Sequence, residues 1–166
     1  MRIAICDDED QERLNIKALV KRYAPELSIV LFSSADELLT AAKTTFFPLI
    51  FLDIEMDDTN GFDAAEELMS GSSQPLIVFV TKSTEYTIRG YDVAFHYLVK
   101  PLNEEKFYEV LKRALRLIVP QYFSFSSNGE LYRIPVQEIL YFESRNYMLF
   151  IHTQQQIYKT RLSLKE

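Results

Sequence analysis

The sequence predicts an α/β fold: a five-stranded parallel sheet wound on both faces by helices, followed by a segment that is mostly β. Two observations carry this prediction. Through residue 118, short apolar runs alternate with segments of helical periodicity, which favours parallel strands joined by crossover helices. After residue 120 the strand-like runs alternate in polarity and no helical pattern separates them.

Composition and charge narrow the class of protein. Of the 166 residues, 48% are hydrophobic, which is enough for a packed core. The single cysteine, Cys6, excludes an internal disulfide and a cysteine-built metal site. The net charge of −6 argues against non-specific coating of nucleic acid. The first apolar run ends at Asp7, too short for a signal peptide, and no run could span a bilayer. We therefore expect a cytoplasmic protein with no membrane partner.

Charge divides the chain where the strand pattern changes. Residues 1–120 hold 13 Lys and Arg against 20 Asp and Glu, a net charge of −7, whereas residues 121–166 hold 5 against 4, a net charge of +1. The sequence therefore predicts one domain at residues 1–118 and a second at residues 119–166, joined near Val119-Pro120-Gln121.

Five strands are expected in the first domain, at residues 2–6, 27–32, 49–53, 76–81 and 94–100. Their continuous apolar runs are typical of strands buried on both faces. Four of the five end in polar groups: Asp7-Asp8, Asp53, Thr81 and Lys100-Pro101. The second ends at Phe32-Ser33, and we expect it at an edge of the sheet, away from the others.

Helices are expected between these strands. Ser34 to Glu37 has the form of a capping box that opens the second helix, and Asn103 is a candidate N-cap for the fifth. The residues expected on buried helix faces are Leu14, Leu19 and Val20 in the first, Phe62, Ala65, Leu68 and Met69 in the third, Tyr86, Ile88 and Tyr91 in a weak fourth, and Phe107, Val110, Leu111, Ala114, Leu117 and Ile118 in the fifth.

The polar strand ends suggest one chemistry. The carboxyl ends of parallel strands share one edge of the sheet, where such folds bind ligands. Clustered carboxylates repel one another unless a cation joins them, and Mg²⁺ prefers oxygen ligands. The cluster can thus hold a divalent cation and let Asp53 attack phosphorus, with Lys100 and Thr81 contacting phosphoryl oxygens. Each of these residues alone is more often an ordinary turn or helix-cap residue; their co-occurrence at four strand ends favours function.

At these residues the sequence resembles the receiver domain of two-component response regulators. The shared residues are Asp7-Asp8, Asp53, Gly61, Thr81 and the run from Ala94 to Pro101. The resemblance implies a flavodoxin-like, doubly wound (βα)5 fold whose Asp53 is phosphorylated by a sensor histidine kinase. It implies that Mg²⁺ is held by Asp8, Asp53 and the backbone carbonyl of Glu55, and by Asp7 largely through water. It also implies a switch formed by Thr81 and Tyr97, and a cis peptide bond at Lys100-Pro101.

Two departures from the family pattern stand beside the site. Lys82 follows Thr81 where the family usually has a small residue, and we expect it to crowd the phosphate or the ring of Tyr97. Asp57 and Asp58 add negative charge to the loop after Asp53. A role in metal binding and an ordinary solvated acidic loop both stay open for them.

The second domain resembles the opening part of a LytTR-type DNA-binding domain. The resemblance rests on the strand from Ile139 to Glu143 and the segment from Arg161 to Lys165, after a predicted tight turn at Asn128-Gly129. A LytTR-type domain is usually about twice as long as this segment, so the match is partial. Arg145 and Asn146, in a loop between strands, are the side chains best suited to DNA phosphates or base edges; an ordinary polar hairpin tip is an equal alternative.

The predicted function is that of a response regulator that is not an enzyme. Phosphorylation of Asp53 is expected to promote a homodimer and to control transcription through the DNA-binding output. Two alternatives remain: a stand-alone or truncated receiver that signals through protein contacts, and a small phosphatase with an aspartyl nucleophile. Against the phosphatase, Glu55 stands where such enzymes generally carry a second Asp for acid catalysis.

Overall fold

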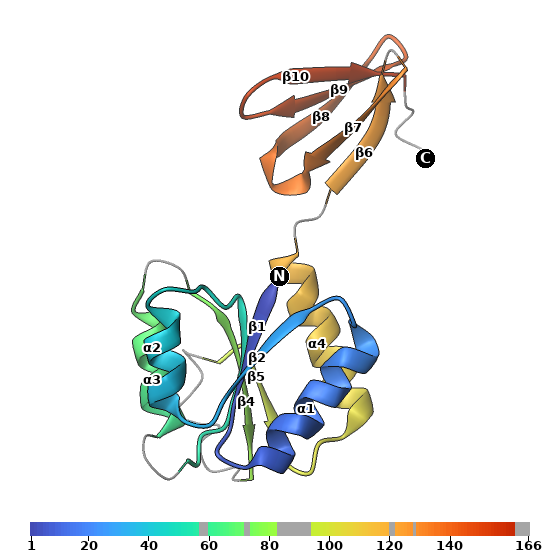
Figure 1. Cartoon of the computed structure of the whole chain (residues 1–166). Helices are drawn as coiled ribbons and strands as arrows, with labels where there is room; N and C mark the ends of the chain where they lie inside the picture. The colour runs from blue at the N-terminus through green and yellow to red at the C-terminus, as the bar shows by residue number, and fades with distance from the viewer. Residues whose placement is uncertain (57–59, 72–73, 83–93, 120–121, 128, 162–166) are drawn as a thin grey trace. The chain divides into compact units, whose positions relative to one another are not determined.

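The computed structural model describes residues 1–56, 60–71, 74–82, 94–119, 122–127 and 129–161, and divides the chain into two compact units, Met1–Ile118 and Val119–Glu166 (Figure 1). Several sequence-based expectations lie outside the described residues: the weak fourth helix with Tyr86, Ile88 and Tyr91, the acidic pair Asp57-Asp58, the turn residue Asn128, and most of the segment from Arg161 to Lys165.

The first unit is built on a five-stranded parallel sheet, as the sequence predicts. Its strands are β1 (Arg2–Cys6), β2 (Ser28–Phe32), β3 (Leu49–Leu52), β4 (Leu76–Thr81) and β5 (His96–Val99). They are ordered β2-β1-β3-β4-β5 and all pairs are parallel. The expected edge position of β2 is confirmed. The crossovers bring β1, β3 and β4 together in the middle, so that the polar groups at their carboxyl ends are neighbours.

Helices cover both faces of this sheet (Figure 1). The helices α1 (Asp10–Tyr23) and α4 (Glu104–Ile118) lie on one face, and α2 (Ala35–Ala42) and α3 (Gly61–Met69) lie on the other. Successive strand residues alternate between the two cores: in β3, Phe51 packs with the α1 and α4 side, and Ile50 packs with the α2 and α3 side. Because the central strands are buried on both faces, β3 is apolar throughout and β1 is apolar after Arg2, which explains the continuous runs in the sequence.

The helix ends follow the predicted capping residues with one shift. Ser34 Oγ accepts a hydrogen bond from the amide of Glu37, whereas the Glu37 carboxylate accepts from Ser33 rather than from Ser34. Asn103 Oδ1 accepts from the amide of Lys106 and so caps α4.

Two of the helix residues expected to be buried are exposed. Leu14 is 53% exposed because it lies two residues, about 200°, from Ile16 on the helix, and Ile16 is the residue that faces the core. Leu117, in the last turn of α4, is 58% exposed, although the neighbouring Ile118 packs against the core. The predicted burial of these two leucines is therefore wrong.

The second unit is made of antiparallel strands, in agreement with the predicted β-rich segment. One sheet pairs β6 (Tyr122–Ser127) with β7 (Glu130–Pro135), and a short 3-10 turn, η2 (Val136–Glu138), leads to a second sheet of β8 (Ile139–Arg145), β9 (Met148–Thr153) and β10 (Ile157–Thr160). Gly129, with φ of 84°, takes the conformation expected for its turn.

A small aromatic and aliphatic core joins the two sheets of this unit. Its buried members are Phe125, Ile134, Leu149 and Ile151. The edges of β6 and β10 are also tied, since Thr160 Oγ1 donates to the carbonyl of Ser126 at 2.7 Å and Ser127 Oγ donates to the carbonyl of Lys159 at 2.7 Å. Among the described residues of the whole chain, no helix is long and apolar enough to cross a membrane.

Candidate functional site

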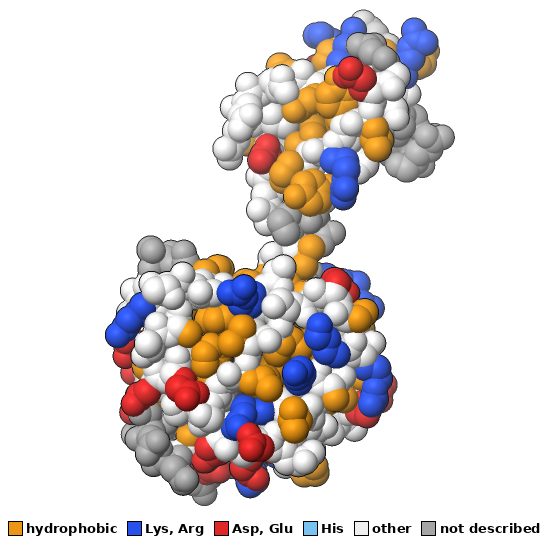
Figure 2. Space-filling view, viewed as in Figure 1, with side chains coloured by type: hydrophobic (Ala, Val, Ile, Leu, Met, Phe, Trp, Pro, Cys, Tyr) orange, Lys and Arg blue, Asp and Glu red, His pale blue; other side chains and the backbone are white. Residues whose placement is uncertain are grey.

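Four side chains from four strand ends meet at one edge of the parallel sheet. Asp7, Asp53, Thr81 and Lys100 are all buried there. Backbone pairing continues one residue past the strands: the Asp53 amide donates to the carbonyl of Cys6 at 2.9 Å, and the Lys100 amide donates to the carbonyl of Thr81 at 2.9 Å. These bonds fix where the side chains stand. In Figure 2, acidic side chains gather at the end of this unit toward which the arrowheads of β4 and β5 point in Figure 1.

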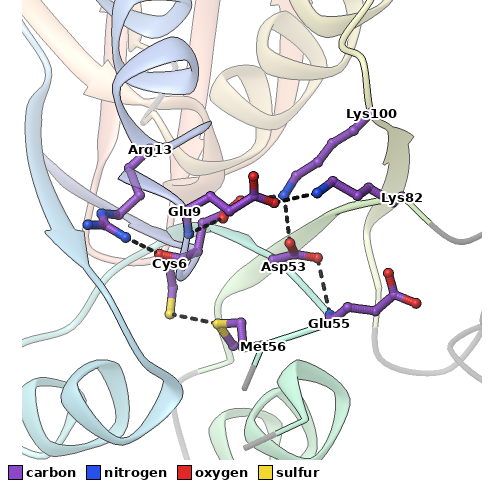
Figure 3. A network of polar contacts seen from close by, with 9 residues as sticks. Cys6, Glu9, Arg13, Asp53, Glu55, Met56, Lys82 and Lys100 are labelled. Carbon is purple, nitrogen blue, oxygen red and sulfur yellow. Dashed lines mark hydrogen bonds and ion pairs between the residues drawn. The ribbon is translucent and has the colours of Figure 1, made fainter. Parts of the chain in front are cut away.

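Lys100 is the cation at the centre of this group. Its Nζ lies 2.6 Å from Asp53 Oδ2 and 2.8 Å from Asp7 Oδ2 (Figure 3). The contact with Asp53 is a hydrogen bond, whereas the contact with Asp7 has the distance of an ion pair without hydrogen-bond geometry. The Lys100 side chain is 3% exposed, so one buried ammonium faces two buried carboxylates.

Burial perturbs both acids. Burial raises the pKa of Asp53 above its ordinary value, and the hydrogen bond from Lys100 opposes that rise. Asp7 behaves in the same way, its pKa being raised by burial and lowered in part by Lys100. Burial alone would lower the pKa of Lys100, but the contacts with Asp53 and Asp7 outweigh it and raise the pKa. Ionising either carboxyl is therefore harder here than in water, because the single ammonium of Lys100 does not fully offset the burial of both acids.

The donor set suits a hard divalent cation. Carboxylate oxygens of Asp7, Asp8 and Asp53 all lie within 4.8 Å of one another, and Asp8 is the most exposed of the three. Asp7 Oδ2 is buried and has only the ammonium of Lys100 close by, at 2.8 Å, and that ammonium is shared with Asp53. All three ligands are oxygens with one side open to water, which fits Mg²⁺ better than a softer ion.

The loop after β3 is held tightly against Asp53. A Cβ placed on Gly61 would lie 1.9 Å from the carbonyl oxygen of Asp53, so only glycine fits there. The amide of Gly61 also donates to the carbonyl of Ile54 at 2.9 Å, and the amide of Glu55 donates to Asp53 Oδ1 at 3.2 Å. The side chain of Glu55 points away from Asp53 (Figure 3). The loop thus offers backbone groups to the site and directs its nearest carboxylate outward.

The remaining predicted residues lie on β4 and β5. Thr81 ends β4 beside Asp53 in the strand order, and its side chain is buried. The ring of Tyr97 is half-buried and packs 5.2 Å from the ring of Phe79, between centroids. The predicted cis peptide bond at Lys100-Pro101 is present. Lys82, expected to crowd the site, turns its ammonium to Glu9 Oε1 at 2.5 Å.

Two contributors to this edge were not predicted from the sequence. Arg13 on α1 is buried and donates a hydrogen bond to the carbonyl of Asp7, which anchors the loop that presents the acidic pair. The sequence does contain a signal for Arg13. It shares the apolar helix face of Ile16 and Val20, and a charged side chain buried on such a face needs a polar partner. Glu9 is the second contributor; nothing in the local pattern pairs it with Lys82, which is 73 residues away.

Cys6, next to the site, takes no part in its chemistry. Its Sγ lies 3.8 Å from Met56 Sδ (Figure 3), and burial, followed by the charge of Asp7, raises the pKa of the thiol to about 12. A thiol with such a pKa stays protonated and unreactive at neutral pH.

Arg145 and Asn146 lie at a hairpin tip of the second unit. Arg145 ends β8 and pairs with Met148, and the two residues between them, Asn146 and Tyr147, have φ of 53° and 58°, as in a type I′ turn. The Arg145 guanidinium lies 5.3 Å from the ring centroid of Phe150, and Lys159 Nζ lies 5.7 Å from the same centroid. Figure 2 shows basic side chains near the end of the unit that the arrowhead of β10 marks in Figure 1.

Comparison with known proteins identifies relatives of both units. Residues 3–112 match the family described as the response regulator receiver domain, and residues 129–166 match the LytTr DNA-binding domain. The sensory transduction protein LytT of Enterococcus faecalis is 28% identical over 96% of this chain and 72% of its own length. LytT of Bacillus subtilis is 32% identical over 68% of this chain and 47% of its own length.

Solved structures show the same fold for the first unit. The response regulatory domain of protein mrkE from Klebsiella pneumoniae aligns with a TM-score of 0.67 at 24% identity, covering 70% of this chain and 97% of that one. The response regulator TrrA from Thermotoga maritima, solved in complex with Mg²⁺ and BeF, aligns with a TM-score of 0.62 at 26% identity, covering 69% of this chain and 98% of that one.

Proposed function

Since the chain belongs to the response regulator receiver family and continues into a LytTR DNA-binding segment, we propose that it is phosphorylated on Asp53 by a sensor histidine kinase and acts on transcription through that segment. The observation that carries the proposal is the contact of Lys100 Nζ with Asp53 Oδ2 at 2.6 Å, both side chains being almost fully buried. This pair sets a carboxylate and a phosphate-binding cation side by side at one sheet edge.

The residues that would hold Mg²⁺ are Asp8, Asp53 and the backbone carbonyl of Glu55, with Asp7 contributing largely through water. Support comes from the closeness of the three carboxylates and from the two buried acids, Asp7 and Asp53, sharing a single ammonium. When bound, the ion supplies positive charge that offsets the charge of the incoming phosphoryl group. Arg13 and Gly61 position this set, Arg13 through the carbonyl of Asp7 and Gly61 through its close approach to Asp53.

The transfer step assigned to Asp53 is a substitution at phosphorus. A carboxylate oxygen of Asp53 forms the new bond to phosphorus while the bond from phosphorus to the kinase histidine breaks, and the imidazole nitrogen keeps the electron pair. Lys100 would then contact one phosphoryl oxygen as a cation, and the Thr81 hydroxyl would donate to another. In this proposal, movement of Thr81 toward the phosphate allows Tyr97 to turn inward, which is the switch.

The test is phosphorylation with a small phosphodonor such as acetyl phosphate in the presence of Mg²⁺, followed by intact-protein mass measurement. We expect a gain of one base-labile phosphoryl group, its loss in Asp53→Asn, and its retention in Asp63→Asn, an exposed aspartate in the first turn of α3. Phosphorylation of the Asp53→Asn protein would refute the assignment.

We propose a regulatory rather than an enzymatic role for this carboxylate. A phosphatase with an aspartyl nucleophile needs a second acid that protonates the leaving group, and the residue two positions on, Glu55, points away from Asp53 in Figure 3. The expected result is stoichiometric phosphorylation without turnover of the donor beyond the slow loss of the aspartyl phosphate. Phosphotransfer and DNA binding would both take place in the cytoplasm.

For the output, we propose that Arg145 and Asn146 contact DNA phosphates or base edges. Both are exposed at the β8–β9 turn, and the neighbouring Tyr147 is 99% exposed. The net charge of +1 after residue 120 neutralises few phosphates, so the 166-residue chain should bind duplex DNA weakly and lose that binding as salt rises. Phosphorylation is proposed to pair two chains, which would let two output segments bind repeated half-sites.

The output proposal is tested by electrophoretic titration of a short mixed-sequence duplex DNA. Arg145→Ala should weaken binding, while Arg133→Ala should leave it nearly unchanged. Arg133 is a matched control because it is also exposed and also stacks on an aromatic ring, that of Tyr122, at 4.9 Å from the centroid. Equal effects of the two variants would favour the rival role, in which the receiver signals through protein contacts.

A further inference from the structure

An exposed ion pair joins the ends of β1 and β4 next to the carboxylate cluster. Glu9 follows the acidic pair after β1, and Lys82 follows Thr81 at the end of β4; Lys82 Nζ lies 2.5 Å from Glu9 Oε1 (Figure 3). In the sheet, β3 lies between β1 and β4, and Asp53 follows β3 directly. The ion pair therefore spans the strand that ends in Asp53.

The two ion-paired side chains are far more exposed than Asp53. The side chains of Lys82 and Glu9 are 60% and 48% exposed, whereas the side chain of Asp53 is 4% exposed. Figure 3 shows the Lys82 ammonium directed at the carboxylate of Glu9. The ion pair is thus more accessible to molecules in solvent than Asp53 is.

The charges of Asp53 and Lys100 also act on Lys82. Its pKa is raised mainly by Glu9, with a smaller rise from Asp53 and an opposing effect from Lys100. A phosphoryl group on Asp53 would add nearly two negative charges and several strong hydrogen-bond acceptors. Because exposed ion pairs are only weakly stabilising, the contact with Glu9 can be exchanged at little cost.

We propose that Lys82 is a strap over Asp53, held by Glu9 while Asp53 is unmodified and transferred to a phosphoryl oxygen once Asp53 carries phosphate, where it slows hydrolysis. This inference rests on the proposed function of Asp53 as phosphoacceptor. It gives Lys82 a role other than the steric crowding that its size alone suggests.

The step that Lys82 would slow is attack of water on the aspartyl phosphate. The water oxygen forms a bond to phosphorus, the bond between phosphorus and the Asp53 oxygen breaks, and its electron pair returns to the carboxylate. The proton lost by the water passes to solvent or to the released inorganic phosphate. A long side chain bound to a phosphoryl oxygen on the solvent side reduces the access of that water.

The experiment measures the lifetime of the aspartyl phosphate in the full chain. Protein phosphorylated with acetyl phosphate and Mg²⁺ is separated from the donor, and the remaining phosphoprotein is followed by intact mass. We expect Lys82→Ala and Lys82→Met to shorten the lifetime about three- to tenfold, the effect of losing one charge-assisted contact. Glu9→Gln, which frees Lys82 for the phosphate, should lengthen the lifetime or leave it unchanged.

The control is Arg22→Ala, which removes a cation from the exposed ion pair of Arg22 with Glu104, 2.9 Å between Nη1 and Oε2. This pair joins α1 to α4 and takes no part in the Asp53 contacts described above, so its loss should not change the lifetime. Unchanged lifetimes in both Lys82 variants, or shortening by Glu9→Gln equal to that by Lys82→Ala, would overturn the strap while leaving Asp53 as phosphoacceptor. Absence of phosphorylation in the unmodified chain would overturn both proposals.

Discussion

Lys100 Nζ lies 2.6 Å from Asp53 Oδ2 and 2.8 Å from Asp7 Oδ2, and the exposed fraction of each of the three side chains is below a twentieth. One ammonium therefore balances only one of two buried carboxylates. This excess of buried carboxylates favours binding of a further cation and destabilises the apo protein. Removing the ammonium, removing one carboxylate or adding Mg²⁺ should each change the stability of the fold.

Lys100→Met should strongly destabilise the apo protein. The substitution keeps the length of the side chain but leaves Asp7 and Asp53 buried without a cation, and breaking a buried ion pair costs about 3–5 kcal/mol. Urea unfolding at neutral pH measures the change. Lys106→Met, on the exposed side of α4, is the matched control. The loss should shrink when Asp53→Asn is added; a loss as small as that of the control would contradict the central role of Lys100.

Asp53→Asn should stabilise the apo protein at neutral pH, and the gain should fall as the pH is lowered. The pKa of Asp53 is raised above 3.8 in the folded state by burial, so the folded protein binds this proton more tightly than the unfolded chain. Stability from this group consequently decreases as pH rises through the raised pKa. The Asp53→Asn substitution removes this decrease in stability, because the amide does not ionise. Melting temperatures of both proteins from pH 4 to pH 8, without Mg²⁺, should converge at the acidic end; a constant difference would show that Asp53 does not titrate in this way.

Mg²⁺ should raise the melting temperature of the unmodified protein. A ligand that binds only the folded state stabilises it by about 2.7 kcal/mol at a hundred times its Kd. Asp8→Asn should weaken the response, since it removes one carboxylate of the cluster, whereas Asp63→Asn should not. If millimolar Mg²⁺ left the melting temperature unchanged, the metal assignment would be wrong.

Gly61→Ala should destabilise the first unit, by about 1–3 kcal/mol or more, because the new methyl group overlaps the carbonyl of Asp53. Gly71→Ala provides the comparison: its Cβ would lie 3.6 Å from the carbonyl oxygen of Leu68, an ordinary contact. Thermal unfolding of the two variants should separate them clearly. Equal effects would mean that the close approach at Gly61 is not a constraint on the loop.

The sheet and its polar edge were predictable because both follow from local patterns. Apolar runs such as Leu49–Leu52 are long enough for a strand and too short for a helix, and the residue that ends each run must lie at the sheet edge once the strands are parallel. The proximity of Asp7, Asp53 and Lys100 thus needed no knowledge of the packing of helices.

Contacts between side chains far apart in the chain were not predictable in this way. The hydrogen bond from Arg13 to the carbonyl of Asp7 depends on how α1 is set against the loop, and the pairing of Glu9 with Lys82 depends on the order of β1, β3 and β4. Leu14 shows the same limit on a smaller scale. The sequence of α1 allows more than one apolar face, and only packing against the sheet determines that the face with Ile16 is the buried one.

The backbone bond from the amide of Lys100 to the carbonyl of Thr81 at 2.9 Å joins the ends of β4 and β5. The two residues whose hydroxyl and ammonium lie at the site of Asp53 are therefore joined through their backbones. In this sheet β5 is an edge strand, and Val99, immediately before Lys100, is 40% exposed to solvent. A displacement of the backbone at Thr81 would therefore also displace Lys100 and the exposed Val99 at this edge of the sheet.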